Sequence, residues 1–202
     1  MPLAGVRGGL AGKPSFNREK MANVASNFSE KSRLRKSIRQ QLSELSLEDR
    51  RRRSIEICQK LERLLAGKKN IALFAPRPTE PDLDLFWELG LLKDRILAYP
   101  RCHGDRLLFF AVCSLSELHP GRFGIREPDS RRSVQHLDAI VLPGLAFTRT
   151  GIRVGQGAGF YDRFLEAAHA DTIKIGVCFD FQVLPNIPRE EHDVNVDLLV
   201  CA

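Results

Sequence analysis

The fold class is decided by residues 139–179, which read AIVLPGLAFTRTGIRVGQGAGFYDRFLEAAHADTIKIGVCF. The apolar run 139–142 ends at a Pro-Gly pair and predicts a buried strand. The spacing of apolar residues becomes helical over 160–169, and a second apolar run over 173–179 predicts another strand. A strand, a helix and a strand in this order are typical of a parallel sheet whose faces are covered by helices.

The same alternation extends outward from this stretch in both directions. Upstream, Leu34, Ile38, Leu42 and Leu45 recur at helical spacing and predict a helix that begins after Ser29. The remaining predicted elements are a helix from Ser46 to Gly67, a helix over 83–92, and strands over 71–75, 96–99, 107–113 and 198–201. We therefore expect one α/β domain over residues 21–202, with three layers and a mostly parallel sheet that carries helices on both faces.

Residues 1–20 are rich in Gly and Pro and show no apolar periodicity, so we expect a disordered extension. They lack the apolar core of a secretory signal. An organelle-targeting segment and a translation start at Met21 are the alternatives for this stretch.

Composition points to an ordinary globular protein. Of the 202 residues, 43% are hydrophobic and 28% are charged, and no apolar run reaches the roughly 20 residues that a membrane-spanning helix needs. The five cysteines form no CxxC pair, which speaks against a zinc knuckle and favours reduced thiols in the cytoplasm. Much of the net charge of +6 lies in two places, the region 31–39 that continues into 50–53, and the pair 131–132. Such basic runs are either a solvated helix face or a site for an anion.

The strongest local motif is the glycine-rich segment 151–163. Gly155, Gly157 and Gly159 alternate, so the backbone can expose successive N–H groups, and a helix follows directly. Arg153 adds a planar cation suited to phosphate oxygens. We interpret the segment as a phosphate-binding turn, with a plain flexible loop as the alternative. It is neither a Walker A loop nor a dinucleotide fingerprint, because no Gly-Lys-Ser/Thr follows and the glycine spacing differs.

Three carboxylates stand next to predicted loops. Asp162 follows the glycines and could bind Mg²⁺ beside a phosphate. The alternative is an acidic residue in the first turn of a helix, where the helix dipole favours negative charge. Asp193 lies in a second acidic segment, which could equally be a solvated turn. Glu80 follows the first strand and could accept hydrogen bonds from a ligand ring, or it marks the entry of a helix. Loops after Ala75, Pro100, Leu142 and Phe179 should meet at the carboxyl edge of the sheet.

Taken together, these residues resemble the 5-formyltetrahydrofolate cyclo-ligase family, also called methenyltetrahydrofolate synthetases. The resemblance covers roughly residues 30–202 and is carried by motifs that occur in the family's order. These are Lys31-Ser-Arg-Leu-Arg35, Glu80, Phe123-Gly-Ile-Arg-Glu-Pro128, Leu142-Pro-Gly-Leu-Ala-Phe147, the glycine-rich segment, Gln182 and His192-Asp193. Some members carry basic residues where this chain has Gln156 and Ala158.

The resemblance implies a role for each matched residue. ATP would be bound by Lys31, Arg35, Arg153, Gly155, Gln156, Gly157, Ala158, Gly159, Phe160 and Tyr161. The folate would be bound by Ala75, Glu80, Phe123 and Phe160. Asp162 and Asp193 would hold Mg²⁺, and catalytic roles would fall to Arg153 and Tyr161.

The implied reaction is the ATP-dependent cyclisation of 5-formyltetrahydrofolate to 5,10-methenyltetrahydrofolate. It would proceed by phosphoryl transfer to the formyl oxygen and attack by N10, in a cytoplasmic monomer that meets neither membrane nor nucleic acid. The folate could carry a polyglutamate tail. A nucleic-acid-binding module is the rival suggested by the positive charge, but the sequence lacks interleaved aromatic and basic residues. A related protein with the same nucleotide loop and another substrate is the second rival.

Overall fold

The computed structural model describes residues 16–190 and 193–202, and for residues 16–28 it describes the backbone alone. Its centre is a six-stranded sheet with the strand order β10-β9-β6-β1-β2-β3. The strands are β1 (Asn70–Ala72), β2 (Ile96–His103), β3 (Arg106–Val112), β6 (Ala139–Leu142), β9 (Ile173–Cys178) and β10 (Leu198–Cys201). All neighbouring pairs are parallel except β2 with β3, which confirms the predicted mostly parallel sheet.

The edge strand β3 runs antiparallel because it forms a hairpin with β2. The two strands are joined by Gly104 and Asp105, and Gly104 has a φ of +63°. A connection this short can only reverse the chain, since a parallel crossover needs a dozen or more residues. Both strands were predicted, and the short turn between them sets their direction.

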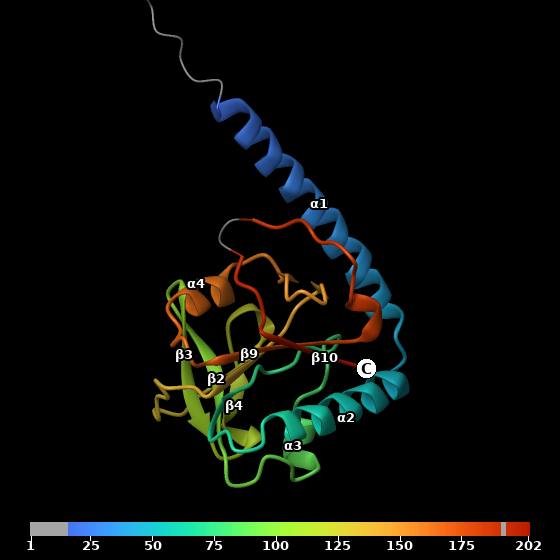
Figure 1. Ribbon diagram of the computed structural model, residues 1–202. Helices are drawn as coiled ribbons and strands as arrows, with labels where there is room; N and C mark the ends of the chain where they lie inside the picture. Colours follow the sequence, from blue (N-terminus) through green and yellow to red (C-terminus); the bar gives the residue numbers. More distant parts are fainter. Residues whose placement is uncertain (1–15, 191–192) are drawn as a thin grey trace, which may run out of the picture.

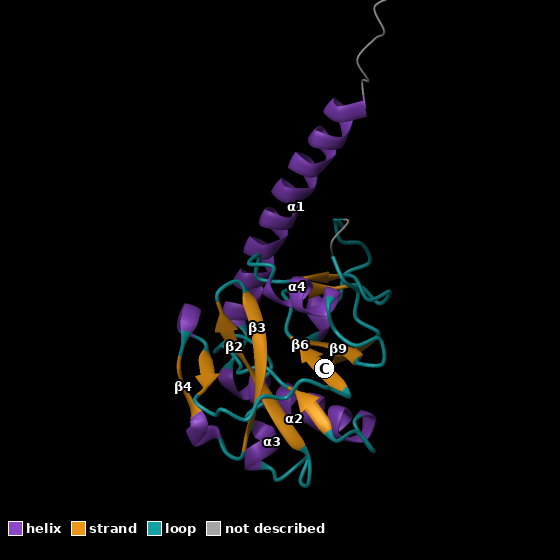
Figure 2. Ribbon diagram, turned by 90° about the vertical axis from the view of Figure 1, so that its left-hand side faces the viewer, coloured by secondary structure: helices purple, strands orange, loops and turns teal. Residues whose placement is uncertain are grey.

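Alternating side chains divide the core into two layers, one on each face of the sheet. Ile71, Tyr99 and Val141 pack on one side, together with residues of helices α1 (Phe16–Glu44), α2 (Leu47–Leu64) and α3 (Leu85–Glu88). Their neighbours in the strands pack on the other side against helix α4 (Phe160–Glu166). Figures 1 and 2 show α4 separated from α2 and α3 by the sheet. The prediction of helices on both faces is confirmed.

Several helix boundaries differ from the prediction. Helix α1 begins at Phe16 rather than after Ser29, so it takes in residues 16–20 of the extension expected to be disordered; residues 1–15 lie outside the described part. No Pro or Gly occurs between Pro14 and Gly67, so nothing local stops the helix from extending upstream of its apolar stripe. Helix α3 is shorter than the predicted 83–92, because Gly90 at φ +64° leaves the helical region.

The other boundaries follow local signals. Ser46 caps α2, since its Oγ accepts a hydrogen bond from the backbone N–H of Asp49 at 3.1 Å. Helix α4 ends at Glu166, before the predicted end at His169. Elements too short to predict complete the fold. They are the strands β4 (Leu118–Pro120), β5 (Arg126–Pro128), β7 (Ala146–Phe147) and β8 (Arg153–Val154), and the 3₁₀ turns η1 (Leu115–Glu117), η2 (Arg122–Gly124) and η3 (Asp180–Gln182).

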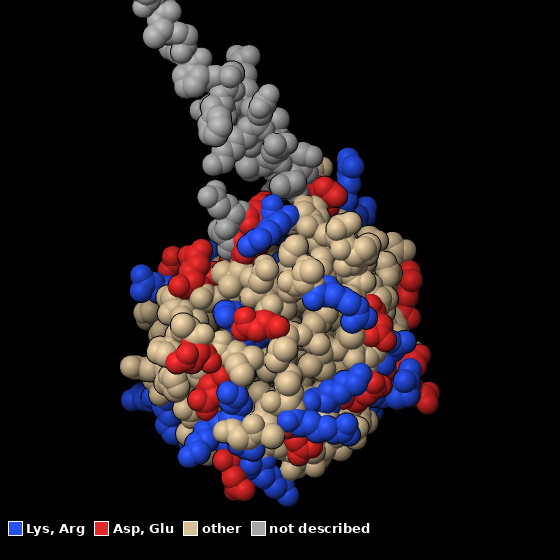
Figure 3. All heavy atoms as spheres, viewed as in Figure 1, with Lys and Arg blue, Asp and Glu red and all other residues tan. Residues whose placement is uncertain are grey.

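Two surface features bear on function. In the part of the chain that the structure describes, no helix is both long enough and apolar enough to cross a membrane. On the face shown in Figure 3, basic and acidic side chains are interspersed rather than gathered by sign. The net positive charge therefore does not form a single basic patch on that face.

Candidate active site

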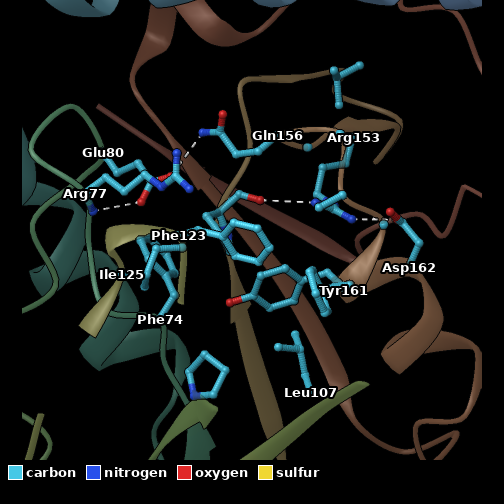
Figure 4. Close-up of a pocket in the computed structure, with 18 of the residues that line it drawn as sticks. Phe74, Arg77, Glu80, Leu107, Phe123, Ile125, Arg153, Gln156, Tyr161 and Asp162 are labelled. Carbon is cyan, nitrogen blue, oxygen red and sulfur yellow. Dashed lines mark hydrogen bonds and ion pairs between the residues drawn. The ribbon is translucent and has the colours of Figure 1, made fainter. Parts of the chain in front are cut away.

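One cavity of about 410 Å³ opens at the carboxyl edge of the parallel strands (Figure 4). It lies at the ends of β1, β2 and β6, as expected for a sheet of this type. Among the described residues of the loop after β9, Glu190 and Asp193 line it, and both are far from the end of that strand. Every residue to which the sequence assigned a role lines this cavity. Those residues are Lys31, Arg35, Ala75, Glu80, Phe123, Arg153, Gly155, Gln156, Gly157, Ala158, Gly159, Phe160, Tyr161, Asp162 and Asp193.

The glycine-rich segment enters this cavity between β8 and α4. The short hairpin of β7 and β8 positions its start, and Gly159 at φ +69° begins α4. Gly157 has a φ of +107°, a conformation open mainly to glycine. A Cβ at Gly155 would lie 2.8 Å from Nη1 of Arg153, so the backbone and the guanidinium can be this close only because position 155 has no side chain.

A buried ion pair ties the two ends of this segment together. Nη2 of Arg153 donates to Oδ1 of Asp162 at 2.6 Å, and Nη1 donates to the carbonyl of Pro143 at 3.3 Å. Arg153 is 5% exposed, and its Nε has no hydrogen-bond partner among the described residues. This Nε is buried away from the cavity, but Nη1 and Nη2 each carry a second N–H, so the guanidinium still has donors for a ligand oxygen.

A second ion pair connects α1 to the segment before β10. Lys31 is only 3% exposed, and its Nζ lies 2.6 Å from a carboxylate oxygen of Asp193 and 2.9 Å from one of Glu190. Asp193 also accepts a hydrogen bond from the backbone N–H of Glu190 at 2.7 Å. The cation predicted to bind phosphate and one predicted metal ligand are therefore paired with each other.

Two arginines on α1 donate hydrogen bonds to the glycine-rich segment. Nε of Arg35 donates to the carbonyl of Gly155 at 3.0 Å. Arg39, one turn further along the same helix face, donates to the side-chain oxygen of Gln156 at 3.0 Å. Lys31, Arg35 and Arg39 are spaced by four residues, so this row of cations could have been found in the sequence, although Arg39 was not among the predicted site residues.

The opposite side of the cavity is formed by Glu80 (Figure 4). The residue is 7% exposed, and its carboxylate accepts hydrogen bonds from the backbone N–H of Arg77 at 3.0 Å and from Nε2 of Gln156 at 3.3 Å. Burial raises the pKa of this carboxyl, and the hydrogen bond and charge of Arg77 and the hydrogen bond of Gln156 oppose the shift. Glu80 is thus an acceptor with its proton affinity increased by its surroundings.

Aromatic rings line the space between these two sides. Phe123 and Phe160 meet edge to face, with centroids 5.8 Å apart, and Phe123 is 57% exposed at a φ of +58°. The guanidinium of Arg122 lies 5.2 Å from the Phe123 ring. Tyr161 also faces the cavity, and burial raises the pKa of its phenol, with the charge of Glu80 acting in the same direction. An aromatic ligand can be held between such rings.

The predicted metal ligands share the cavity without forming a ready-made cage. Asp162 and Asp193 each pair with a cation, Arg153 and Lys31 respectively. Within the described residues, no three acidic, His or Cys side chains are grouped closely enough to hold a metal. Two carboxylates fit Mg²⁺ of the kind that completes its shell with phosphate oxygens and water.

Some cavity residues escaped the sequence reasoning. Besides Arg39, they include Arg77, Cys102, Arg122, Glu127 and Glu190. Arg122 directly precedes Phe123, and Arg77 lies between Ala75 and Glu80, so each is a cation close in sequence to predicted ligand contacts. Glu127 lies inside the motif 123–128 that carries the resemblance, but it was given no role. Cys102 carries no such signal, because only the tertiary fold brings it to the cavity.

Comparison with known proteins agrees with this geometry. Residues 27–202 match the model of the 5-formyltetrahydrofolate cyclo-ligase family. The 5-formyltetrahydrofolate cyclo-ligase of Mus musculus is 30% identical over 194 residues, covering 88% of this chain and 95% of its own. The corresponding protein of Escherichia coli K12 is 34% identical over 127 residues, covering 60% and 69% of the two chains.

Solved structures give the same result. The NMR structure of 5,10-methenyltetrahydrofolate synthetase from Aquifex aeolicus superposes with a TM-score of 0.75 at 38% identity, covering 85% of this chain and 89% of the other. The synthetase from Mycoplasma pneumoniae superposes with a TM-score of 0.69 at 26% identity, covering 85% and 98%. The predicted α/β fold and the predicted family are both confirmed.

Proposed function

We propose, from the premise that this chain belongs to the 5-formyltetrahydrofolate cyclo-ligase family, that it converts 5-formyltetrahydrofolate to 5,10-methenyltetrahydrofolate at the expense of ATP. Its relatives are named as ligases of this substrate or as synthetases of this product. ATP dependence, Mg²⁺ and the residue roles that follow are part of the proposal.

The observation that carries the proposal is the division of one cavity into two chemically different sides. Figure 4 places Arg153 and Asp162 on one side and Glu80 with Arg77 on the other. The glycine-rich segment runs between them through Gln156. A reaction that joins a triphosphate to a ring system needs both sides within reach of each other.

The cationic side suits the triphosphate. Arg35 and Arg153 reach the cavity from α1 and β8, and Lys31 adds a buried ammonium. The backbone from Gly155 to Gly159 faces the same space. Phosphoryl transfer depends on positioning and on neutralising charge, so cations and backbone donors can do this work without a strong base.

The other side suits the pterin ring of the folate. Glu80 offers carboxylate oxygens to ring N–H donors, Phe123 and Phe160 supply faces or edges for the ring, and Ala75 leaves space beside it. Each carboxylate contact to a donor contributes about 1.5–3 kcal/mol when it is shielded from water. We assign ring recognition to these four residues.

The chemical steps follow from the reactivity of the formyl group. The N5-formyl group is an amide, so its carbon is a poor electrophile and its oxygen a poor leaving group. Transfer of the γ-phosphoryl of ATP to the formyl oxygen forms an O–P bond and releases ADP. N10 then attacks the formyl carbon and loses its proton, the C–O bond breaks, and phosphate leaves with the former formyl oxygen.

Arg153 and Tyr161 are the residues that we place closest to this chemistry. Arg153 would neutralise charge on the transferring phosphoryl group through its positive charge and the second N–H groups of Nη1 and Nη2. The pKa of Tyr161 is raised, so its phenol keeps its proton and can donate to the formyl oxygen. Asp162 and Asp193 would hold Mg²⁺, which supplies further neutralisation of the phosphates.

We propose a monomer in the cytoplasm that accepts folates with or without a polyglutamate tail and binds neither membrane nor nucleic acid.

The test is a direct assay. Purified protein is given 5-formyltetrahydrofolate, Mg²⁺ and ATP, and the absorbance of the methenyl product is followed alongside ADP release. We expect product and ADP in equal amounts, and no product when ATP is omitted. Stabilisation by ATP without any by a reduced folate, and no methenyl product, would overturn the substrate assignment and favour a relative with another substrate.

A further inference from the structure

We infer that Gln156 is a positioning residue that couples nucleotide binding to folate binding, by linking Arg39 on α1 to Glu80. This inference rests on the proposed function, because that function defines which side of the cavity takes which ligand. Two contacts of Gln156 carry it, one with α1 and one with Glu80.

The first contact faces α1. Nη2 of Arg39 donates to Oε1 of Gln156 at 3.0 Å and lies 3.5 Å from its backbone carbonyl. Arg35 holds the preceding carbonyl, that of Gly155, at 3.0 Å. Two successive residues of the segment are therefore held by two arginines one helical turn apart, and both guanidinium groups line the cavity on the proposed nucleotide side.

The second contact faces the proposed folate side. Nε2 of Gln156 donates to Oε1 of Glu80 at 3.3 Å, while Oε2 of the same carboxylate accepts from the backbone N–H of Arg77. Among the described residues, these two donors fix the orientation of the Glu80 carboxylate. The N–H of Arg77 belongs to the same turn as Glu80, whereas Nε2 of Gln156 comes from the glycine-rich segment.

The chemistry of the amide explains why a Gln suits this position. An amide both accepts and donates, so Oε1 can meet a guanidinium while Nε2 meets a carboxylate. A lysine or arginine at position 156 would donate to Glu80 but could not accept from Arg39. The side chain therefore links two groups of opposite charge that are not in direct contact, and movement of the segment moves the donor that Glu80 receives.

A consequence for binding follows. A nucleotide that contacts Arg35, Arg39 and the glycine-rich segment restricts the motion of that segment. Gln156 then stays in the position from which it donates to Glu80. Folate then binds to a carboxylate that is already oriented. Because coupling between two ligands is reciprocal, folate must tighten nucleotide binding by the same factor.

The first experiment measures this coupling by titration calorimetry. The folate dissociation constant is determined with and without a non-hydrolysable ATP analogue, in the wild type, in Gln156→Ala and in Gln40→Ala. Gln40 is the matched control, because it lies on α1 beside Arg39 but does not line the cavity, and its side chain donates to Glu44 of the same helix at 3.2 Å. We expect the analogue to tighten folate binding about tenfold in the wild type and in Gln40→Ala, and less than about twofold in Gln156→Ala, the order expected for one hydrogen bond to a charged group.

A second measurement separates positioning from a general structural effect. The charge of Arg77 lowers the pKa of Glu80, and the charge of Glu80 raises the pKa of Tyr161. Both neighbours are unchanged in the variants. Folate binding should weaken as pH falls through the pKa of Glu80, because the protonated acid accepts fewer hydrogen bonds. Gln156→Ala removes a donor to Glu80, so the pH at which folate binding weakens, the acid limb of the binding profile, should move to higher pH. Gln156→Lys adds a cation beside Glu80 and should move this acid limb to lower pH.

The outcomes are distinguishable. If the wild type makes the methenyl product but Gln156→Ala keeps the full coupling factor, the inference is overturned and the proposed function stands. Shifts of the pH limb in the same direction for both variants would also overturn it, since loss of local structure would affect both alike. If the wild type makes no product and binds no folate, the proposed function itself fails. Melting temperatures within a few degrees of wild type confirm that the variants are folded.

Discussion

Arg153 and Asp162 are joined at 2.6 Å across the glycine-rich segment, one from β8 and the other from the first turn of α4. The pair closes the segment into a loop with a fixed base. Both side chains also line the cavity. The carboxylate predicted to bind a metal therefore also has a structural partner, and the two roles can be separated by experiment.

Asp162→Asn tests the metal role, since it keeps the shape of the side chain and removes its charge. If Asp162 binds Mg²⁺, we expect kcat to fall by about 100-fold, as for other losses of charge stabilisation at a reacting phosphate. The Mg²⁺ concentration for half-maximal rate should rise, and excess Mg²⁺ should restore part of the activity. Steady-state kinetics over a range of Mg²⁺ concentrations checks this.

The control is Asp193→Asn, assayed in the same way and combined with Asp162→Asn. Two ligands of one ion act as a unit, so the double variant should be little worse than the worse single variant. Normal Mg²⁺ dependence in Asp193→Asn would instead assign Asp193 solely to its ion pair with Lys31.

Arg35→Ala tests the phosphate role of α1. Loss of a charge-assisted contact of about 1.5–3 kcal/mol should raise the KM for ATP by about tenfold or more. The KM for folate should change much less. Arg35→Lys is the companion variant, and it should recover only part of the loss, because an ammonium cannot reproduce the planar donor that meets Gly155. Equal weakening of both ligands would assign Arg35 to the support of the fold.

Glu80→Gln should lower the affinity for folate and raise the stability of the protein at neutral pH. The pKa of Glu80 is raised by burial, so its ionisation costs the ligand-free protein stability as pH rises through that pKa. The amide carries no such cost. We expect the melting temperature of the variant, relative to wild type, to increase from acidic to neutral pH, while its folate affinity falls at least about tenfold. A relative melting temperature that is the same at both pH values would contradict the assignment.

Gly151→Ala should destabilise the protein more than Gly104→Ala. Both glycines have a positive φ, at +89° and +63°, so both variants bear a backbone cost of about 1 kcal/mol. A Cβ at Gly151 would also lie 2.2 Å from the carbonyl of Val196, whereas nothing lies within 4 Å at Gly104. We expect a total loss of about 3 kcal/mol for Gly151→Ala, or about 6–12 °C in melting temperature, measured by calorimetry. Equal losses would mean that the backbone around Val196 yields to the methyl group.

The sequence predicted those parts of the fold whose signals are local. The run 139–142 became β6 with the predicted ends, because four apolar residues are followed at once by Pro143 and Gly144. Ser46 capped its helix as expected. Strands β7 and β8 could not be predicted, because two residues each are too short for any periodicity and they form by pairing with segments that are not adjacent in sequence.

The site was predicted as a set of residues but not as a set of contacts. The pairing of Lys31 with Asp193 joins residues 162 positions apart, and local sequence patterns contain no information about such contacts. The same holds for Gln156, whose partners lie on α1 and after β1. Chemistry-bearing residue types can be read from motifs, whereas their partners in the ligand-free protein depend on how the loops fold against each other.

The strand order has a consequence for how the molecule is made. Strands β1, β2 and β3 occupy one half of the sheet, and β6, β9 and β10 the other. During synthesis, the strands of the first half can pair as they leave the ribosome. The other edge of β1 stays unpaired until residues 73–138 have been made and β6 follows. Lys31 is made early and meets Asp193 only when the chain is nearly complete. The binding cavity is therefore among the last features to form, so a prematurely ended chain lacks it even where half of the sheet has folded.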